Sequence, residues 1–84
     1  MTLDEISVRL RAFLAENFLY MRPGLQLRDE DDLLETEVID STGVMELVAF
    51  VEDEFSLSVP DRDIAIDNFG SIKALTGYVG ARQG

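Results

Sequence analysis

The chain has 84 residues, which suffices for one small domain with a thin core and without a deep catalytic cleft. Seven basic residues against seventeen acidic ones give a net charge of −10, which disfavours nucleic acids and anionic membranes and favours basic protein surfaces as partners. The absence of cysteine and histidine excludes disulfides, thiolate metal sites and histidine-based acid–base catalysis.

Neither a membrane span nor a signal peptide is visible in the sequence. No apolar run approaches the roughly 20 residues that cross a bilayer. The first twenty residues carry Asp4, Glu5, Arg9 and Arg11 in place of an uninterrupted apolar segment. We therefore expect a cytoplasmic, monomeric protein with a single domain over residues 1–84.

Residues 2–19 carry the pattern of an amphipathic helix. Thr2 and Glu5 have the spacing of a capping box, which predicts a helix N-terminus. Apolar residues then recur at helical intervals: Leu3, Ile6, Leu10, Phe13, Leu14 and Phe18. We expect this helix to run to about residue 19, with Pro23-Gly24 preventing its continuation.

Residues 20–40 show no sustained period and predict a long loop. A loop of this length in a compact domain is normally functional or disordered. This one is acidic, but it also carries aliphatic residues: Leu25, Leu27, Leu33, Leu34, Val38 and Ile39. They favour an ordered loop held against a core, with one helical turn near Asp31 to Glu35.

A second amphipathic helix is expected from about Ser41 to Phe55. At roughly 100° per residue, one arc of the helix is apolar and should be buried: Val44, Leu47, Val48, Val51 and Phe55. Glu46, Ala49 and Asp53 fall on the opposite side, and Ser41, Met45 and Glu52 follow one edge. The serine hydroxyl should therefore emerge beside a partly apolar, acidic edge of the helix.

The last third of the sequence predicts a short helix and a final long one. Pro60-Asp61 suits a helix start, followed by one or two turns over Arg62 to Ala65 that end at Asp67-Asn68. Asn68 or Ser71 is a candidate cap for the last helix. Gly80 and the polar tail Arg82-Gln83-Gly84 should end the domain. The predicted fold class is all-α, a small four-helix bundle of three main helices and a short one.

Ser41 is the main candidate for chemistry, although a serine beside an aspartate at a helix start is often only a structural cap. Its context favours a functional role for Ser41 over a purely structural one, because an acidic helix face follows it and the chain offers no other group suited to chemistry. A helix N-terminus presents unpaired N–H groups and a partial positive charge, which suits a phosphodiester on this hydroxyl.

The segment from Leu33 to Pro60 resembles the core of the phosphopantetheine-binding family of acyl and peptidyl carrier proteins. The matching features are the pair Asp40-Ser41, the Glu46-Leu47-Val48 that follows and the acidic ending before Phe55. The first helix, the loop length and the segment from Asn68 to Ile72 also fit, so the resemblance covers nearly the whole chain.

The resemblance implies a carrier rather than an enzyme. Ser41 would carry 4′-phosphopantetheine donated by coenzyme A, with Asp40 and Thr42 beside it, and the thiol of that arm would hold an acyl or aminoacyl group as a thioester. Implied partners are a phosphopantetheinyl transferase, an acyl- or aminoacyl-activating ligase and downstream acyl-using enzymes. They would bind a surface made of Met45, Glu46, Ala49, Glu52 and Asp53.

Two positions depart from the family pattern. Thr42 stands where leucine usually follows the serine, and Glu37 stands where glycine is frequent. The sequence Asp-Ser-Thr-Gly is closer to stand-alone carriers loaded by adenylate-forming ligases than to housekeeping fatty-acid carriers. Thr42 therefore puts the choice of partner in doubt, but not the attachment.

Other interpretations fit the residues less well. Asp40 to Gly43 resembles an aspartic-protease triplet, but the glycine comes one residue late. The run Asp29 to Asp32 lacks the spacing of an EF-hand, so we expect no dedicated metal site. Phe13, Phe18 and Tyr20 lack the basic patch of a nucleotide platform.

Two further functions were weighed. A hydrolase that uses Ser41 lacks a base. An unmodified acidic adaptor that binds a basic protein surface is the principal alternative to a carrier.

Overall fold

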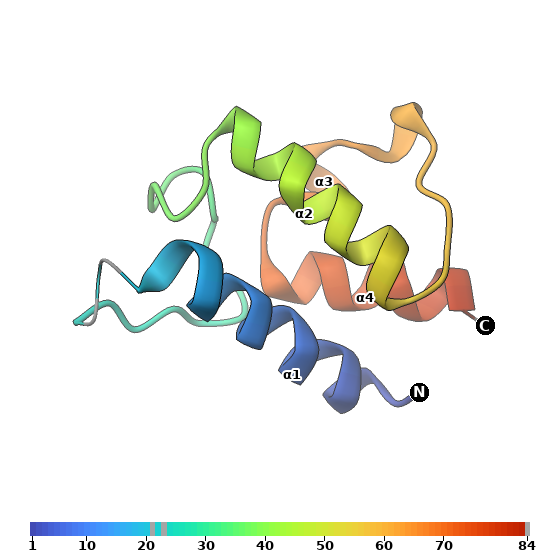
Figure 1. Ribbon diagram of the computed structural model, residues 1–84, viewed down its shortest axis with the longest axis horizontal. Coiled ribbons are helices and arrows are strands. Elements are labelled where there is room, and N and C mark those ends of the chain that lie inside the picture. Colours follow the sequence, from blue (N-terminus) through green and yellow to red (C-terminus); the bar gives the residue numbers. More distant parts are fainter. Residues whose placement is uncertain (21, 23, 84) are drawn as a thin grey trace.

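The computed structural model describes residues 1–20, 22 and 24–83, and these residues form helices and no strands. The elements in chain order are α1 (Leu3–Leu14), the π-helical turn η1 (Ala15–Leu19), α2 (Ser41–Glu54), the 3₁₀ turn η2 (Asp61–Asp63), α3 (Ile66–Phe69) and α4 (Ile72–Gln83). Figure 1 shows α1 and α4 lying next to each other, with α2 above α1 in the view and its last turns in front of α4. The predicted all-α bundle of three main helices and a short one is confirmed.

The first helix begins and ends where the sequence predicts. The Thr2 hydroxyl accepts a hydrogen bond from the Glu5 N–H at 3.2 Å, so the N-terminal cap is formed. After Leu14 the helix widens into η1 and ends at Leu19. Pro23, the predicted stop signal, lies outside the described residues.

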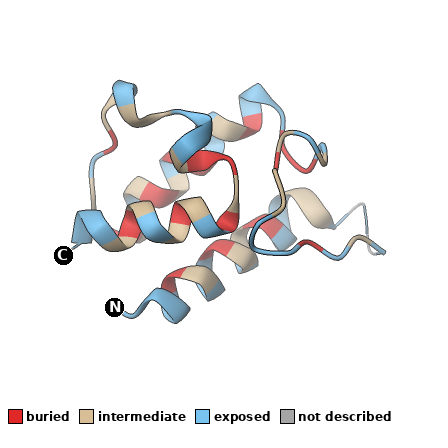
Figure 2. Ribbon diagram, turned by 180° about the vertical axis from the view of Figure 1, so that it is seen from behind, coloured by how far each residue is buried: buried red, intermediate tan, exposed pale blue. Residues whose placement is uncertain are grey.

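One aliphatic core joins the three long helices and the loop (Figure 2). The helices contribute Ile6, Leu10 and Leu14 from α1, Leu47, Val48 and Val51 from α2, and Ile72, Leu75 and Val79 from α4. The predicted apolar arc of α2 is therefore the buried one, with Val44 half-buried at its edge. Leu3 belongs to the apolar repeat of the first helix but is 58% exposed, because it lies at the first turn of α1, where it reaches over Gly80 of α4.

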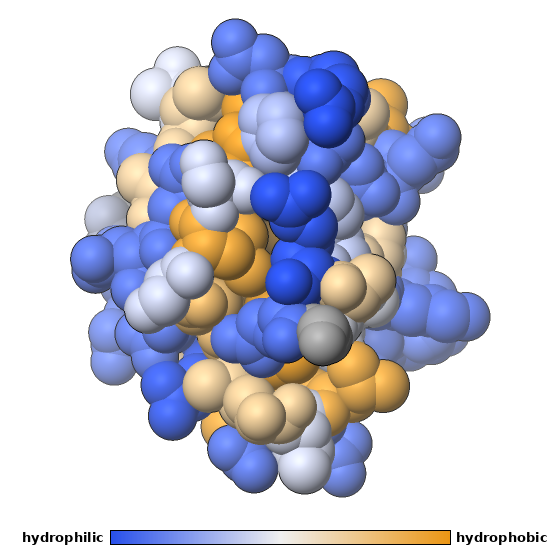
Figure 3. Space-filling view, turned by 90° about the vertical axis from the view of Figure 1, so that its right-hand side faces the viewer, coloured by the Kyte–Doolittle hydropathy of each residue, from blue (hydrophilic) through white to orange (hydrophobic). Residues whose placement is uncertain are grey.

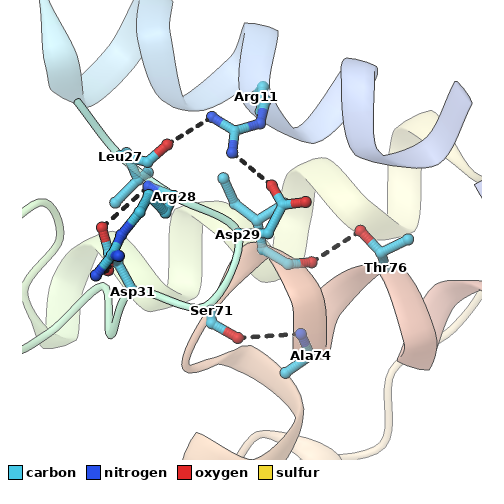
Figure 4. A network of polar contacts seen from close by, with 9 residues as sticks. Arg11, Leu27, Arg28, Asp29, Asp31, Ser71, Ala74 and Thr76 are labelled. Carbon is cyan, nitrogen blue, oxygen red and sulfur yellow. Dashed lines mark hydrogen bonds and ion pairs between the residues drawn. The ribbon is translucent and has the colours of Figure 1, made fainter. Parts of the chain in front are cut away.

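The loop over residues 24–40 is held to the helices by specific polar contacts (Figure 4). The Arg11 guanidinium of α1 donates to the Leu27 carbonyl at 2.8 Å and pairs with the Asp29 carboxylate. The Asp29 carbonyl accepts from the N–H of Lys73 in the first turn of α4 at 2.9 Å. Buried Leu27, Leu33, Val38 and Ile39 complete the attachment, so the prediction of an ordered loop is confirmed.

The expected helical turn in this loop runs over residues 33–37. The Asp32 carboxylate caps it by accepting from the N–H groups of Leu34 and Glu35, each at 2.9 Å. The turn closes with the N–H of Val38 on the Leu33 carbonyl at 3.0 Å and that of Glu37 on the Leu34 carbonyl at 3.1 Å. This is a Schellman pattern, and it leaves Glu37 in the left-handed region at φ 60°.

The predicted short helix starts after Pro60 as expected, but the prediction of one continuous helix is wrong. Two pieces replace it, η2 and α3, because Ala65 is extended (φ −143°, ψ 161°) at a position where the helix was expected to continue. The Asn68 amide donates to the Asp63 carbonyl at 2.9 Å, and this hydrogen bond bridges the break. Burial of Phe69 against Tyr78 of α4 favours the later start, with the ring centroids 5.6 Å apart.

The last helix is capped by Ser71 rather than Asn68. The Ser71 hydroxyl accepts from the Ala74 N–H at 3.0 Å. The last helix continues through Gly80 and ends at Gln83, within the polar tail that was expected to end the domain. Gly80 lies under the side chain of Leu3 in α1, where an added Cβ would come within 2.7 Å of Leu3 Cδ2 and the leucine would have to shift.

The N-terminus and the end of α4 lie at the end of the bundle where α2 also ends (Figure 1). Figure 3 views this end, where apolar patches are separated by hydrophilic side chains. Within the described residues, no helix is long and apolar enough to cross a membrane.

Candidate functional site

The N-terminus of α2 is capped by Asp40. This residue has the extended backbone of an N-cap (φ −109°, ψ −174°), and its Oδ1 accepts from the Gly43 N–H at 2.7 Å. The Asp40 carbonyl accepts from the Val44 N–H at 3.0 Å, which begins the helical hydrogen bonds. The cap is therefore the aspartate and not the serine.

Ser41 is the first residue of α2 and is exposed. Within the described residues, its hydroxyl takes part in no hydrogen bond. The structural role that a serine commonly has at this place is already filled by Asp40. The hydroxyl is thus accessible and is not needed to hold the helix.

A hollow of about 360 Å³ lies beside this first turn. Its lining joins the end of η1 to the start of α2: Asn17, Phe18, Glu37, Val38, Ile39, Asp40, Thr42, Gly43 and Glu46. Thr42 is exposed at its edge, where a leucine side chain would add apolar surface. The side of α2 next to Ser41 is therefore concave and acidic.

The residues proposed to meet partners divide into two groups on α2. Met45, Glu46, Ala49 and Asp53 are exposed, and Met45 keeps 55% of its surface in solvent. Glu52 is half-buried, and its Oε2 accepts from the Val59 N–H at 2.9 Å. Glu52 therefore lies on the edge of α2 and also holds the loop that follows this helix.

The acidic run before the site is used to build the loop. Asp29 pairs with Arg11, and Asp32 caps the helical turn. The Arg28 N–H donates to Asp31 at 2.9 Å, and this bond together with the Arg28 guanidinium lowers the pKa of Asp31 below its usual value. Among the described residues, no group of histidine, cysteine and carboxylate side chains is placed to hold a metal ion.

Sequence reasoning missed two features near α2. One is an open apolar hollow of about 210 Å³ between α2 and α3, lined by Leu34, Val44, Ile64, Ala65, Ile66 and Phe69. Its walls depend on the displaced short helix, so helical periodicity alone does not reveal it. The other is the close approach of Phe18, which lies in the π-helical turn η1, to Gly43.

Comparison with known proteins gives the family. A family model described as the phosphopantetheine attachment site matches residues 8–79, whereas no curated protein sequence matches the chain. Domains of this family are non-catalytic carriers of covalently attached 4′-phosphopantetheine, and they interact with a phosphopantetheinyl transferase and with acyl-handling enzymes. Because the match extends from α1 into α4, this chain belongs to the phosphopantetheine-binding carrier family and is a carrier, not an enzyme.

Proposed function

We propose that Ser41 is the residue that carries 4′-phosphopantetheine. The observation that supports this most directly is the division of roles at the start of α2. Asp40 caps the helix through the Gly43 N–H, and the exposed Ser41 hydroxyl makes no hydrogen bond within the described residues. A substituent on this hydroxyl would displace no packed side chain and break no cap.

The first turn of α2 suits a phosphate group. The N–H groups of Ser41 and Thr42 lie where an α-helix supplies no acceptor of its own. They and the partial positive charge of the helix end would hold the phosphodiester despite the acidic surroundings. Asp40 is expected to help the transferase place Ser41 for modification.

The proposed function is to carry an acyl or aminoacyl group between enzymes. When bound, the arm supplies the terminal thiol that holds this cargo as a thioester, and the chain itself contains no cysteine. Loading by an adenylate-forming ligase, in biosynthesis of the fatty-acid, polyketide or nonribosomal-peptide type, is the route that the sequence Asp40 to Gly43 favours. We also propose that residues 1–84 act as one monomeric, cytoplasmic carrier domain.

The exposed side of α2 is the proposed surface for partner enzymes. It joins Met45 and Ala49 to the carboxylates of Glu46 and Asp53, with Glu52 along its edge. Such a surface fits a basic groove, and exposed charges of this kind favour fast, modest and salt-sensitive binding.

The attachment is tested by intact-mass spectrometry. Incubation with coenzyme A, Mg²⁺ and a promiscuous phosphopantetheinyl transferase should add the mass of one arm to the wild-type chain. Ser41→Ala should gain nothing, whereas Ser58→Ala, which removes another exposed serine, should be modified like the wild type. A mass gain in Ser41→Ala would refute the assignment.

The partner surface is tested by charge reversal. Glu46→Lys with Asp53→Lys should slow modification, and Asp4→Lys with Glu16→Lys, an equal change in charge on α1 and η1, should not. Equal slowing by both pairs would show that net charge, and not this surface, governs the encounter. A wild-type chain that is never modified but binds a basic partner through α2 would instead support the unmodified adaptor.

A further inference from the structure

The π-helical turn η1 gives Phe18 a position that an α-helix does not provide. In an α-helix, residues three and four apart are neighbours on one face, whereas a π-helix widens the turn so that residues five apart approach. The rings of Phe13 and Phe18 are five residues apart, and their centroids lie 5.8 Å from each other in an edge-on arrangement. The Phe18 ring therefore packs edge-on against Phe13 across the widened turn.

Phe18 reaches the first turn of α2. A Cβ built on Gly43 would lie 3.1 Å from Phe18 Cε1 and 3.1 Å from Ile39 Cβ, so the glycine permits this close approach. Gly43 is also the residue whose N–H is held by the Asp40 side chain at 2.7 Å. The ring therefore supports, from the side, the turn that presents Ser41.

The rest of α2 is held by other contacts. Leu47, Val48 and Val51 lie in the aliphatic core, and Phe50 stacks on Phe13 with the centroids 4.2 Å apart. Phe18 is the aromatic contact at the N-terminal end, and its side chain is only half-buried. Its loss should release the first turn while the body of the helix stays in place.

We propose that Phe18 is a positioning residue for the modification of Ser41. It acts through Gly43 and the Asp40 cap and does not react itself. This inference rests on the proposed attachment at Ser41. It adds a residue of the π-helical turn, outside the attachment segment, to the groups that determine how fast the serine is modified.

Steady-state kinetics of modification test the proposal. The transferase should bind Phe18→Leu through an unchanged α2 face, so KM should stay near the wild-type value. A loosened first turn should lower kcat by about tenfold, the kind of loss that small displacements of a reacting group produce. Phe50→Leu is the matched control, because it shortens another ring of the same aromatic row and should leave kcat unchanged.

Hydrogen exchange gives a readout that needs no transferase. The Gly43 amide should exchange faster in Phe18→Leu than in the wild type, with the Val51 amide unchanged, because only the first turn opens. In Phe50→Leu the Gly43 amide should keep its wild-type rate. Equal acceleration at Gly43 and Val51 would show general destabilisation and overturn the positioning role.

A size exchange completes the test. Gly43→Ala should crowd the ring and lower kcat, and the double variant Phe18→Leu with Gly43→Ala should recover part of the loss, since the smaller side chain leaves room for the added methyl group. If kcat of the double variant is no higher than the product of the two single effects predicts, the proposed contact between Phe18 and Gly43 does not control modification and the proposal is overturned. Failure of the attachment itself appears differently, as a wild-type chain that gains no mass.

Discussion

Glu37 occupies a backbone conformation that favours glycine, and replacing it should stabilise the protein. Its φ of 60° places it at the left-handed position that closes the helical turn over residues 33–37. Its side chain is exposed and makes no hydrogen bond within the described residues. Glu37→Gly therefore removes strain without removing a contact.

The expected gain follows from two opposing terms. The left-handed region destabilises a residue that has a Cβ by roughly 1–2 kcal/mol. Glycine loses more chain entropy on folding, which returns about 0.5–1 kcal/mol of that gain. The net increase in the free energy of unfolding should be about 0.5–1 kcal/mol, or about 2–8 °C in Tm for a domain of this size.

Urea and thermal unfolding followed by circular dichroism measure this change. The matched control is Glu35→Gly in the same turn, which removes the same charge from a residue without a positive φ. It should destabilise by about 0.5–1 kcal/mol, so the two glycine variants should move in opposite directions. If both variants gain stability equally, relief of charge repulsion and not backbone strain is the cause, and the reasoning fails.

Three further predictions concern capping, pH and salt. Asp40→Ala should lower the free energy of unfolding by about 1 kcal/mol, because it removes the cap on Gly43, while Ser41→Ala should change it by less than about 0.5 kcal/mol in the same urea titration. Burial and, secondarily, the hydrogen bond to Asp63 raise the pKa of Tyr78 above 10.0. The protonated phenol therefore stabilises the folded state below pH 10, and this stabilisation is lost as the pH rises further. Above pH 10 the urea midpoint of Tyr78→Phe should fall less steeply with pH than that of the wild type. At a net charge of −10, Tm should rise with added NaCl or millimolar Mg²⁺, and a flat response would contradict charge-limited stability.

Much of the fold follows from periodicity and caps that act over a few residues. The Thr2 cap, the extent of the first helix and the buried arc of α2 depend on neighbouring residues, and the structure has them as predicted. The short helix could not be placed in this way. Its start depends on Phe69 packing against Tyr78 of another helix, and that contact is not encoded in local spacing.

The same division holds at the candidate site. The pair Asp40-Ser41 at a helix start and the acidic face of α2 could be predicted from the residues, because helix starts and helical faces are local properties. The carrier function followed from the resemblance of this segment to the phosphopantetheine-binding family. Only the tertiary structure shows that Asp40, and not Ser41, caps the helix and that Phe18 lies against its first turn. Those facts depend on hydrogen-bond geometry and on a contact between segments 25 residues apart in sequence, for which only the folded chain fixes the distances.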